Sequence, residues 1–424
     1  MTTRRQFLSS GALLVGGLLA ERAAAAPQIL TRSDPHTADP LWLGQGRPYQ
    51  PVVTPNGWSL PSVVRDGVKE FHLVAEPVRR EFAPGMTVNA WGYNGTTPGP
   101  TIEAVEGDRV RIFVTNRLQE HTSVHWHGIR LPNGMDGVGG LTQPHIPPGK
   151  TFVYEFTLPR SGTFMYHPHS DDMLQVAMGM MGLFIVHPRN RRERPVDRDY
   201  CILLHNWDIE AGTATPKPST MTEFNVWTFN SRAFPGTAPL VAGLGERVRI
   251  RIGNLSMHDH PIHLHGYDMQ VTGTDGGWVP KPAQWPEITV NVPVGAMRAF
   301  EFVADAPGDW ALHCHKMHHT MGPMGHAVPN LLGVSQRGLA GRIGKLVDGY
   351  MAMGEHGMAE MQQMQMDLPE NTLPMMAGEG PFGPLEMGGM FTVLKVREGL
   401  ARDDYRDPGW YVHPPGTVAR EVTG

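Results

Sequence analysis

The stretch His313-Cys314-His315-Lys316-Met317-His318-His319-Thr320-Met321-Gly322-Pro323-Met324 contains one of the two cysteines in this chain of 424 residues. The cysteine lies between two histidines, another histidine follows at position 319, and a methionine ends the stretch at position 324. Two imidazoles, one thiolate and a weakly bound axial methionine are the ligands of a blue-copper electron-transfer site. Cys314, His319 and Met324 would supply three of these ligands, so one histidine must come from elsewhere.

An internal repeat organises the chain around this stretch. The sequence GDRVRI at 107–112 aligns without gaps on GERVRI at 245–250, and a second match relates residues 162–169 to residues 308–315. Self-similarity of this kind indicates two copies of one structural unit. Short β-type runs separated by turn signals, together with 50 glycines and 38 prolines, predict that each copy is a β-sandwich or barrel.

The two copies differ at the positions that matter for copper. Where the second copy has His260 and Cys314, the first has Thr122 and Pro168. Only the second copy can therefore build the blue-copper site, and His260 is the missing fourth ligand.

Each copy also carries two His-x-His elements, which are His125/His127, His167/His169, His263/His265 and His313/His315. Residues i and i+2 of a strand project from the same face, about 6.5–7 Å apart. Two pairs from each copy could thus line a cavity with eight imidazoles, a number that suits three copper ions. Cys314 must face away from His313 and His315, so its sulfur would bind one copper while the flanking imidazoles bind two others. One mononuclear and three clustered coppers can store the four electrons that reduce dioxygen to water.

These motifs resemble the four copper motifs of multicopper oxidases. The resemblance implies an all-β fold of two cupredoxin-like Greek-key domains and four coppers per chain. It assigns the type 1 copper to His260, Cys314, His319 and Met324. It assigns the type 2 copper to His125 and His263, and the type 3 pair to His127, His167, His169, His265, His313 and His315. Thr320 departs from the family pattern, since many relatives carry an acidic residue at this position.

Asp136 matches the acidic residue that helps to protonate oxygen in the family, so we expect a catalytic role for it beside Cys314. The alternative is an ordinary turn, because aspartate before glycine (here Gly137) is common in turns.

We predict a signal segment at 1–26, an extended lead-in at 27–64, cupredoxin-like domain 1 at 65–190, domain 2 at 199–335 and a Met-rich C-terminal extension at 336–424. The extension has helical character at 336–368 and a strand at 390–396. Ten of the 25 methionines lie between Met351 and Met390. Met353 and Met364 share a helix face, which could bind Cu(I) through thioethers or could simply fill core space.

The Met-rich segment resembles that of bacterial cuprous oxidases linked to copper tolerance, so Cu(I) is the expected donor. A general laccase for phenols is the main alternative. A two-domain copper nitrite reductase or a copper-binding protein without activity is less consistent with the residues. Two-domain relatives with the type 1 site in domain 2 form homotrimers, with the cluster between domain 1 of one chain and domain 2 of the next. An arrangement within one chain stays open.

Composition and the N-terminus restrict the partners and the compartment. Charged residues make up 18% of the chain and the net charge is −5, so neither nucleic acid nor an anionic membrane is an expected partner. Residues 1–26 combine Arg4-Arg5 with a short apolar run, which predicts periplasmic export by the twin-arginine route, or by an ordinary secretory signal, without a membrane span. Cys201 lies in an apolar run and Cys314 is a ligand candidate, so we expect no disulfide.

Overall fold

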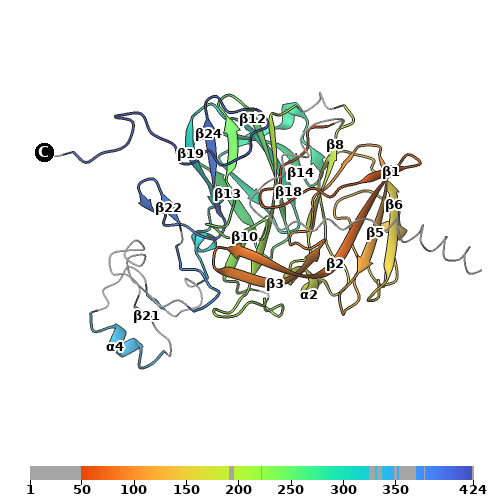
Figure 1. The fold of residues 1–424 in the computed structure, drawn as a ribbon, viewed down its shortest axis with the longest axis horizontal. Helices are drawn as coiled ribbons and strands as arrows, with labels where there is room; N and C mark the ends of the chain where they lie inside the picture. The colour runs from red at the N-terminus through yellow and green to blue at the C-terminus, as the bar shows by residue number, and fades with distance from the viewer. Residues whose placement is uncertain are drawn as a thin grey trace, which may run out of the picture. The chain divides into compact units, whose positions relative to one another are not determined.

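The computed structural model describes residues 49–190, 195–220, 222–323, 330–331, 337–347, 351–352, 369–376 and 378–422. The predicted signal segment lies outside these residues. Domain 1 is built from eight strands: β1 Val63–Arg65, β2 Val68–Ala83, β3 Met86–Tyr93, β4 Ile102–Val105, β5 Arg109–Asn116, β6 Thr151–Thr157, β7 Gly162–Tyr166 and β8 Gly182–His187. They form one sheet in the order β1-β2-β5-β6, with β3 paired to β2, and a second sheet in the order β4-β8-β7. Figure 1 labels β1, β2, β3, β5, β6 and β8 of this domain.

Domain 2 contains twelve of the described strands: β9 Arg198–Trp207, β10 Val226–Phe229, β11 Leu240–Gly243, β12 Arg247–Asn254, β13 His260–Leu264, β14 Met269–Thr274, β15 Gly277–Trp278, β16 Trp285–Glu287, β17 Thr289–Val292, β18 Met297–Val303, β19 Gly308–Cys314 and β24 Phe391–Arg397. One sheet has the order β10-β9-β12-β18-β14-β15, with β16 paired to β14, and the other has the order β11-β24-β19-β13-β17. The all-β fold predicted from the sequence is confirmed.

The repeat is visible in the strand pairing. In domain 1, β2 pairs with β5 in parallel and β5 pairs with β6 in antiparallel fashion; β9, β12 and β18 repeat this arrangement in domain 2. The second sheets also correspond, because β4-β8-β7 and β11-β24-β19 each join a parallel pair to an antiparallel one. Strand β24 is therefore the domain 2 counterpart of β8.

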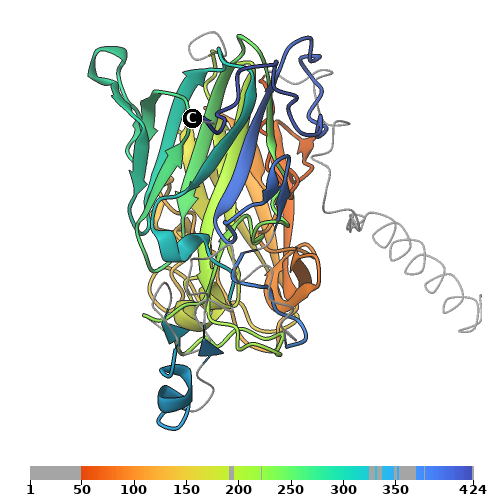
Figure 2. The ribbon, with the colours of Figure 1, turned by 90° about the vertical axis from the view of Figure 1, so that its left-hand side faces the viewer.

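The position of β24 differs from the domain boundaries drawn from the sequence. The predicted strand at 390–396 was assigned to an extension that follows domain 2, whereas β24 lies between β11 and β19 inside the domain 2 sheet. Figure 2 shows this blue strand beside the green strands of domain 2. The Met-rich segment is thus an insertion between β19 and the last strand of the sheet, and β24 was misplaced because strand pairing over such a separation leaves no local signal.

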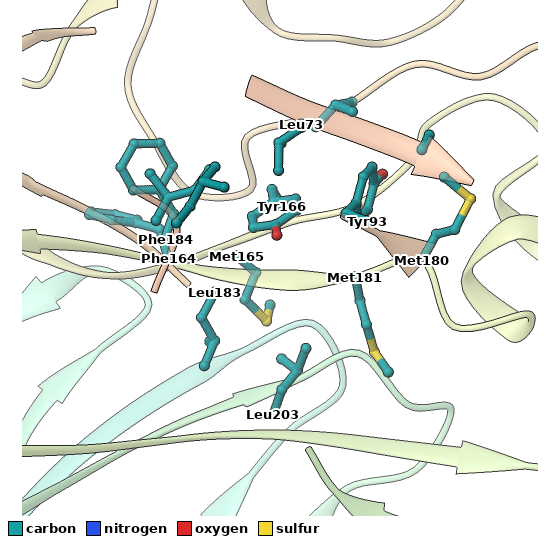
Figure 3. Packing of buried hydrophobic residues seen from close by; sticks show 14 of the residues in the cluster. Leu73, Tyr93, Phe164, Met165, Tyr166, Met180, Met181, Leu183, Phe184 and Leu203 are labelled. Atoms are coloured by element: carbon teal, nitrogen blue, oxygen red, sulfur yellow. The ribbon is translucent and has the colours of Figure 1, made fainter. Parts of the chain in front are cut away.

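Strand β9 joins the two domains through its buried side chains. All ten of its residues are buried. Tyr200, Ile202 and Leu204 pack in the domain 2 core, while Cys201 and Leu203 pack in the domain 1 core. This alternation is the period-2 pattern of a strand that is covered on both faces. Figure 3 shows the side chains of Met165, Met181 and Leu183 of domain 1 pointing toward Leu203.

Helices are short in the described part of the chain. They comprise α2 Asp172–Ala177, α4 Ala340–Ile343 and the 3-10 turns η2 Asn133–Met135, η3 Lys281–Ala283 and η4 Met317–Thr320. Two small strand pairs, β20 Asn330–Leu331 with β21 Met351–Ala352 and β22 Glu379–Gly380 with β23 Gly383–Pro384, complete the described elements. No helix among these residues is long and apolar enough to cross a membrane. Both cysteines are buried and free, as expected from the sequence.

Candidate copper centres

His260, Cys314 and His319 come together in domain 2. The Cys314 Sγ atom lies 3.6 Å from His260 Nδ1 and 3.3 Å from His319 Nδ1, and these two nitrogen atoms are 3.1 Å apart. All three side chains are buried. A cysteine sulfur and two imidazole nitrogens that converge on one point form a donor set that suits copper.

The pairing of β13 with β19 explains this convergence. In the antiparallel register, Ile262 lies opposite Cys314 and His263 lies opposite His313. Successive residues of a strand point to opposite faces. Cys314 therefore enters the domain 2 core beside Ile262, whereas His263 and His313 project from the other face. One pair of strands presents a donor set on each of its faces.

Burial sets the protonation of the three inward-facing donors. It lowers the pKa of His260 to about 3 and also lowers the pKa of His319, so both imidazoles are neutral at neutral pH. It raises the pKa of the Cys314 thiol to about 11. A neutral imidazole offers a lone pair to a metal ion, and a thiol releases its proton when an ion binds. The donors therefore fit a cation that accepts sulfur and nitrogen ligands.

Two residues that the sequence did not point out hold the imidazoles in place. The Ser256 Oγ atom lies 2.6 Å from His260 Nε2. The His319 ring stacks on Trp227, with centroids 4.6 Å apart and an interplanar angle of 19°. His258 and His318 both contact the ring of His319, at centroid distances of 5.4 Å and 4.3 Å.

The four outward-facing histidines of domain 1, called here the domain 1 quartet, are His125, His127, His167 and His169. His125 and His167 form an antiparallel bridge, and the rings of His127 and His169 lie 5.7 Å and 5.6 Å from the ring of His125. His127 Nδ1 is 3.2 Å from His167 Nε2. Burial lowers the pKa of His167 to about 3, which keeps this imidazole neutral.

Backbone carbonyl groups orient two members of the domain 1 quartet. His125 Nδ1 donates to the Asp136 carbonyl and His167 Nδ1 donates to the Pro168 carbonyl, each at 2.8 Å. A proton on Nδ1 leaves the lone pair on Nε2, so these hydrogen bonds fix which nitrogen can bind a metal.

The corresponding domain 2 quartet is His263, His265, His313 and His315. His265 Nε2 lies 3.1 Å from His313 Nε2, and the ring of His315 lies 5.5 Å from that of His263. His263 Nδ1 donates to the Ile288 carbonyl at 2.6 Å and His313 Nδ1 donates to the Cys314 carbonyl at 2.9 Å. Both copies therefore orient their imidazoles through backbone carbonyls.

The two quartets do not meet within one chain. Among the described residues, no ring contact and no hydrogen bond joins them. The domain 1 quartet instead lines a cavity of about 500 Å³ whose opposite wall comes from residues 205–206, 255–257 and 294–295 of domain 2. In the domain 2 quartet, His265 and His315 are exposed. Among the described residues, each quartet therefore makes its ring contacts and hydrogen bonds without a member of the other.

The described residues of domain 1 contain no counterpart of the buried sulfur and imidazole set. The Thr122 hydroxyl, at the position of His260, donates to Gln175 Oε1 at 2.7 Å, and Gln175 Nε2 donates to the His121 carbonyl at 2.7 Å. Thr122 and Gln175 are both fully buried. A satisfied pair of neutral polar side chains takes the place of the metal donors, in agreement with the difference between the two sequence copies.

Asp136 lies beside the domain 1 quartet. Its carboxylate Oδ1 is 3.6 Å from His125 Nδ1, and its carbonyl accepts the hydrogen bond from the same nitrogen. The next residue, Gly137, has φ of +87°, and a Cβ atom there would collide with the Val124 carbonyl. Only glycine fits this turn, which fixes the position of the carboxylate.

Backbone hydrogen bonds join the segment that follows His319 to the segments around Met375 and Gly388. Gly322 N donates to the Met375 carbonyl at 2.6 Å, Gly388 N donates to the Thr320 carbonyl at 2.8 Å and Met390 N donates to the His319 carbonyl at 2.9 Å. Thr320, the departure from the family pattern, is buried and its hydroxyl donates to the Met317 carbonyl. Met324, Met353 and Met364 lie outside the described residues.

Fold and site together define an all-β protein of the cupredoxin class with a candidate copper site that contains a cysteine sulfur. Comparison with known families agrees, because residues 75–191 and 211–331 each match a family described as multicopper oxidase. The chain belongs to the multicopper oxidase family, whose members hold copper as their cofactor.

Individual relatives carry related names. Copper resistance protein A of Escherichia coli is 29% identical over 347 residues, covering 68% of this chain and 55% of that protein. Laccase-2 of Cryptococcus neoformans is 31% identical over 252 residues, covering 49% and 41%. The crystal structure of a blue copper oxidase from Nitrosomonas europaea gives a TM-score of 0.57 at 27% identity, covering 77% of this chain and 85% of that one. The chain therefore spans about half the length of these two curated relatives.

Proposed function

We propose that this chain is an oxidase that couples the one-electron oxidation of a donor to the reduction of dioxygen to water. Four donor molecules each lose one electron, and one dioxygen takes up these four electrons and four protons to give two waters. The observation that carries the proposal is Cys314, which lies on β19 between His313 and His315 with its sulfur on the opposite face from His313.

The inward donor set would hold a type 1 copper through His260, Cys314 and His319, with Met324 as the axial ligand expected from the sequence. Of the two quartets, His125 and His263 would hold a type 2 copper, and the type 3 pair would be held by His127, His167, His169, His265, His313 and His315. Copper at these positions would supply one-electron transfer and oxygen reduction. The chain supplies a short path between them, because Cys314 is bonded directly to His313 and His315 and its carbonyl accepts a hydrogen bond from His313.

The cluster of three coppers would form between chains in a homotrimer. Each quartet is a half-site, and a single chain keeps the halves apart. Exposed His265 and His315 are the groups that a neighbouring chain would cover. Apolar residues near the quartets also reach solvent: Ile288, whose carbonyl orients His263, is 57% exposed, and Met173, which lines the cavity of the domain 1 quartet, is 60% exposed. Exposed apolar side chains beside metal sites that lack part of their ligands are suited to a subunit interface.

We propose Cu(I) as the donor and a role in copper tolerance. The Met-rich insertion begins after the His319 loop and returns to it through Gly388 and Met390, so its two ends are fixed beside the inward donor set. Thioether sulfur is a soft ligand that prefers Cu(I). The similarity to copper resistance protein A supports this donor, whereas the similarity to laccase-2 supports a phenolic donor as the alternative.

Oxygen uptake with an electron donor tests the activity. Purified protein should consume one dioxygen per four donor electrons and should contain four coppers per chain. Cys314→Ser should abolish both the blue absorption and the oxygen uptake, since serine cannot replace the sulfur ligand. Cys201→Ala is the matched control, because Cys201 lies in the interdomain core and should leave the blue absorption intact. One or two coppers per chain, or blue absorption in Cys314→Ser, would contradict the proposal.

Turnover of Cu(I) and of a phenol by the same variants tests the donor. Replacing Met353 and Met364 with leucine should slow Cu(I) oxidation and leave phenol oxidation unchanged, because leucine keeps the volume but removes the sulfur. Unchanged Cu(I) turnover in both variants would exclude a role for these two methionines.

Two alternative functions explain fewer of these structural observations. A two-domain copper nitrite reductase would place the blue site in domain 1, where Thr122 and Gln175 occupy the corresponding position. A copper carrier would need no cysteine between two quartet histidines.

For localisation, the Arg4-Arg5 pair and the apolar run of residues 1–26 support export to the periplasm through the twin-arginine route.

A further inference from the structure

Ser256 makes the shortest hydrogen bond to His260. Its Oγ atom lies 2.6 Å from His260 Nε2, 2.7 Å from Asn254 Oδ1 and 2.8 Å from the His258 carbonyl oxygen. Ser256 is only 3% exposed. Ser256 also lies in the wall of the cavity that the domain 1 quartet lines, but its hydroxyl is held by these three protein groups.

The chemistry of these partners decides the tautomer of His260. Asn254 Oδ1 and the His258 carbonyl can only accept hydrogen bonds, and a serine hydroxyl has a single proton to donate. That proton is directed to the carbonyl-type oxygens, so Ser256 Oγ accepts from His260 Nε2. The imidazole then carries its proton on Nε2 and directs the Nδ1 lone pair to the point shared with Cys314 and His319.

The domain 1 copy lacks this hydroxyl although its loop is built in the same way. Asn116 Nδ2 donates to two backbone carbonyls and Asn116 Oδ1 accepts from Leu118 N. Asn254 makes the same three bonds in domain 2, where Ser256 N replaces Leu118 N. The asparagine is thus structural in both copies. The serine hydroxyl occurs only in the copy that has Cys314, and buried Leu118 fills its place in the other.

The partner imidazole is held differently. His319 Nε2 is buried and has no hydrogen-bond partner among the described residues. Its ring is positioned by stacking on Trp227 and His258. Of the two imidazoles, only His260 has its metal-binding nitrogen selected by a side-chain hydrogen bond.

We propose that Ser256 is the positioning residue of the type 1 centre. It fixes the Nε2–H tautomer of His260 and so sets how tightly the type 1 copper is retained. This inference rests on the proposed type 1 site. Hydrogen-bond partners of ligating histidines typically contribute about 10–100-fold to metal affinity.

The test measures copper retention in the complete enzyme. Copper-loaded wild type, Ser256→Ala and Ser256→Thr are equilibrated with a competing copper chelator, and the blue absorption reports the type 1 copper. Ser256→Ala should lose this copper at about 10–100-fold lower chelator concentration and should change the position or intensity of the blue band. Ser256→Thr keeps the hydroxyl and should restore both. Thr115→Ala removes a hydroxyl from an exposed pair in domain 1 and serves as the control, with wild-type values.

Each outcome has a distinct meaning. A wild-type enzyme without a blue band would refute the type 1 site itself. A blue wild type with unchanged retention and spectrum in Ser256→Ala would overturn the role of Ser256 alone. Equal loss in Ser256→Ala and Ser256→Thr would also overturn it, because packing rather than the hydroxyl would then matter. If Ser256→Ala did not fold, as judged by circular dichroism, Ser256→Thr alone would decide, since it must retain copper as the wild type does.

Discussion

Asp136 offers a way to separate proton delivery from electron transfer. Its carboxylate lies 3.6 Å from His125 Nδ1 in a turn that only Gly137 allows. We propose that Asp136 delivers protons to reduced oxygen, and general acid catalysis of this kind contributes about 100-fold or more. Asp136→Asn should therefore slow oxygen uptake by about 100-fold. Anaerobic bleaching of the blue band by a donor should keep its rate, as should both reactions in the exposed control Glu120→Gln. Equal slowing of both reactions in Asp136→Asn would contradict this role.

His205 should make the copper-free protein sensitive to acid. Burial lowers its pKa to about 4, and its Nδ1 donates to the Leu255 carbonyl at 2.6 Å. Between pH 6.5 and 4 the unfolded chain binds a proton that the folded protein does not, so stability falls as the pH falls. The loss from this residue between pH 7 and pH 5 is about 2 kcal/mol. Urea unfolding of His205→Gln should show a correspondingly smaller loss. An identical pH dependence in variant and wild type would exclude His205 as a source.

Strand β24 makes the C-terminal segment part of domain 2. It pairs with β11 and β19 and buries Phe391, Leu394 and Val396. A chain ending at Glu386 would lose this strand and expose the edges of β11 and β19. It would also lose the hydrogen bonds that Gly388 and Met390 donate beside His319. It should fail to form a soluble blue protein. A chain ending at Gly416 lacks residues 417–424, of which the described ones are all exposed, and it should behave as wild type. A blue, soluble protein ending at Glu386 would show that the sheet tolerates the loss.

At the scale of the whole molecule, the separation of the quartets predicts complementation between chains. One variant carries His167→Ala with His169→Ala and the other carries His263→Ala with His265→Ala, so each is inactive alone. When the two variants are co-expressed and form mixed trimers with shared clusters, the intact domain 1 of one variant lies beside the intact domain 2 of the other. Random mixing should restore about a quarter of the clusters and of the oxygen uptake. No restoration in mixed trimers would place the cluster within one chain.

The domain boundaries depend on which strands of the chain pair within each sheet. The repeat at 107–112 and 245–250 identified two copies of a β unit, because equivalent strands β5 and β12 carry the same alternating side chains. The last strand of the second unit was placed outside it, because about 75 residues separate β19 from β24 and pairing at that distance has no local signature. The shared strand β9 was likewise not predictable as a link, since its alternation fits any strand that is buried on both faces.

The sequence by itself determined the chemistry of the candidate centres. The spacing His-Cys-His forces sulfur and imidazoles onto opposite faces of one strand, and this follows from strand geometry without any knowledge of the rest of the fold. Tertiary structure alone decided which groups support these donors. The hydrogen bond from His260 to Ser256, the stacking of Trp227 on His319 and the isolation of the two quartets all depend on how loops and domains pack. Such contacts join residues whose proximity is set by the whole core, so no local pattern encodes them.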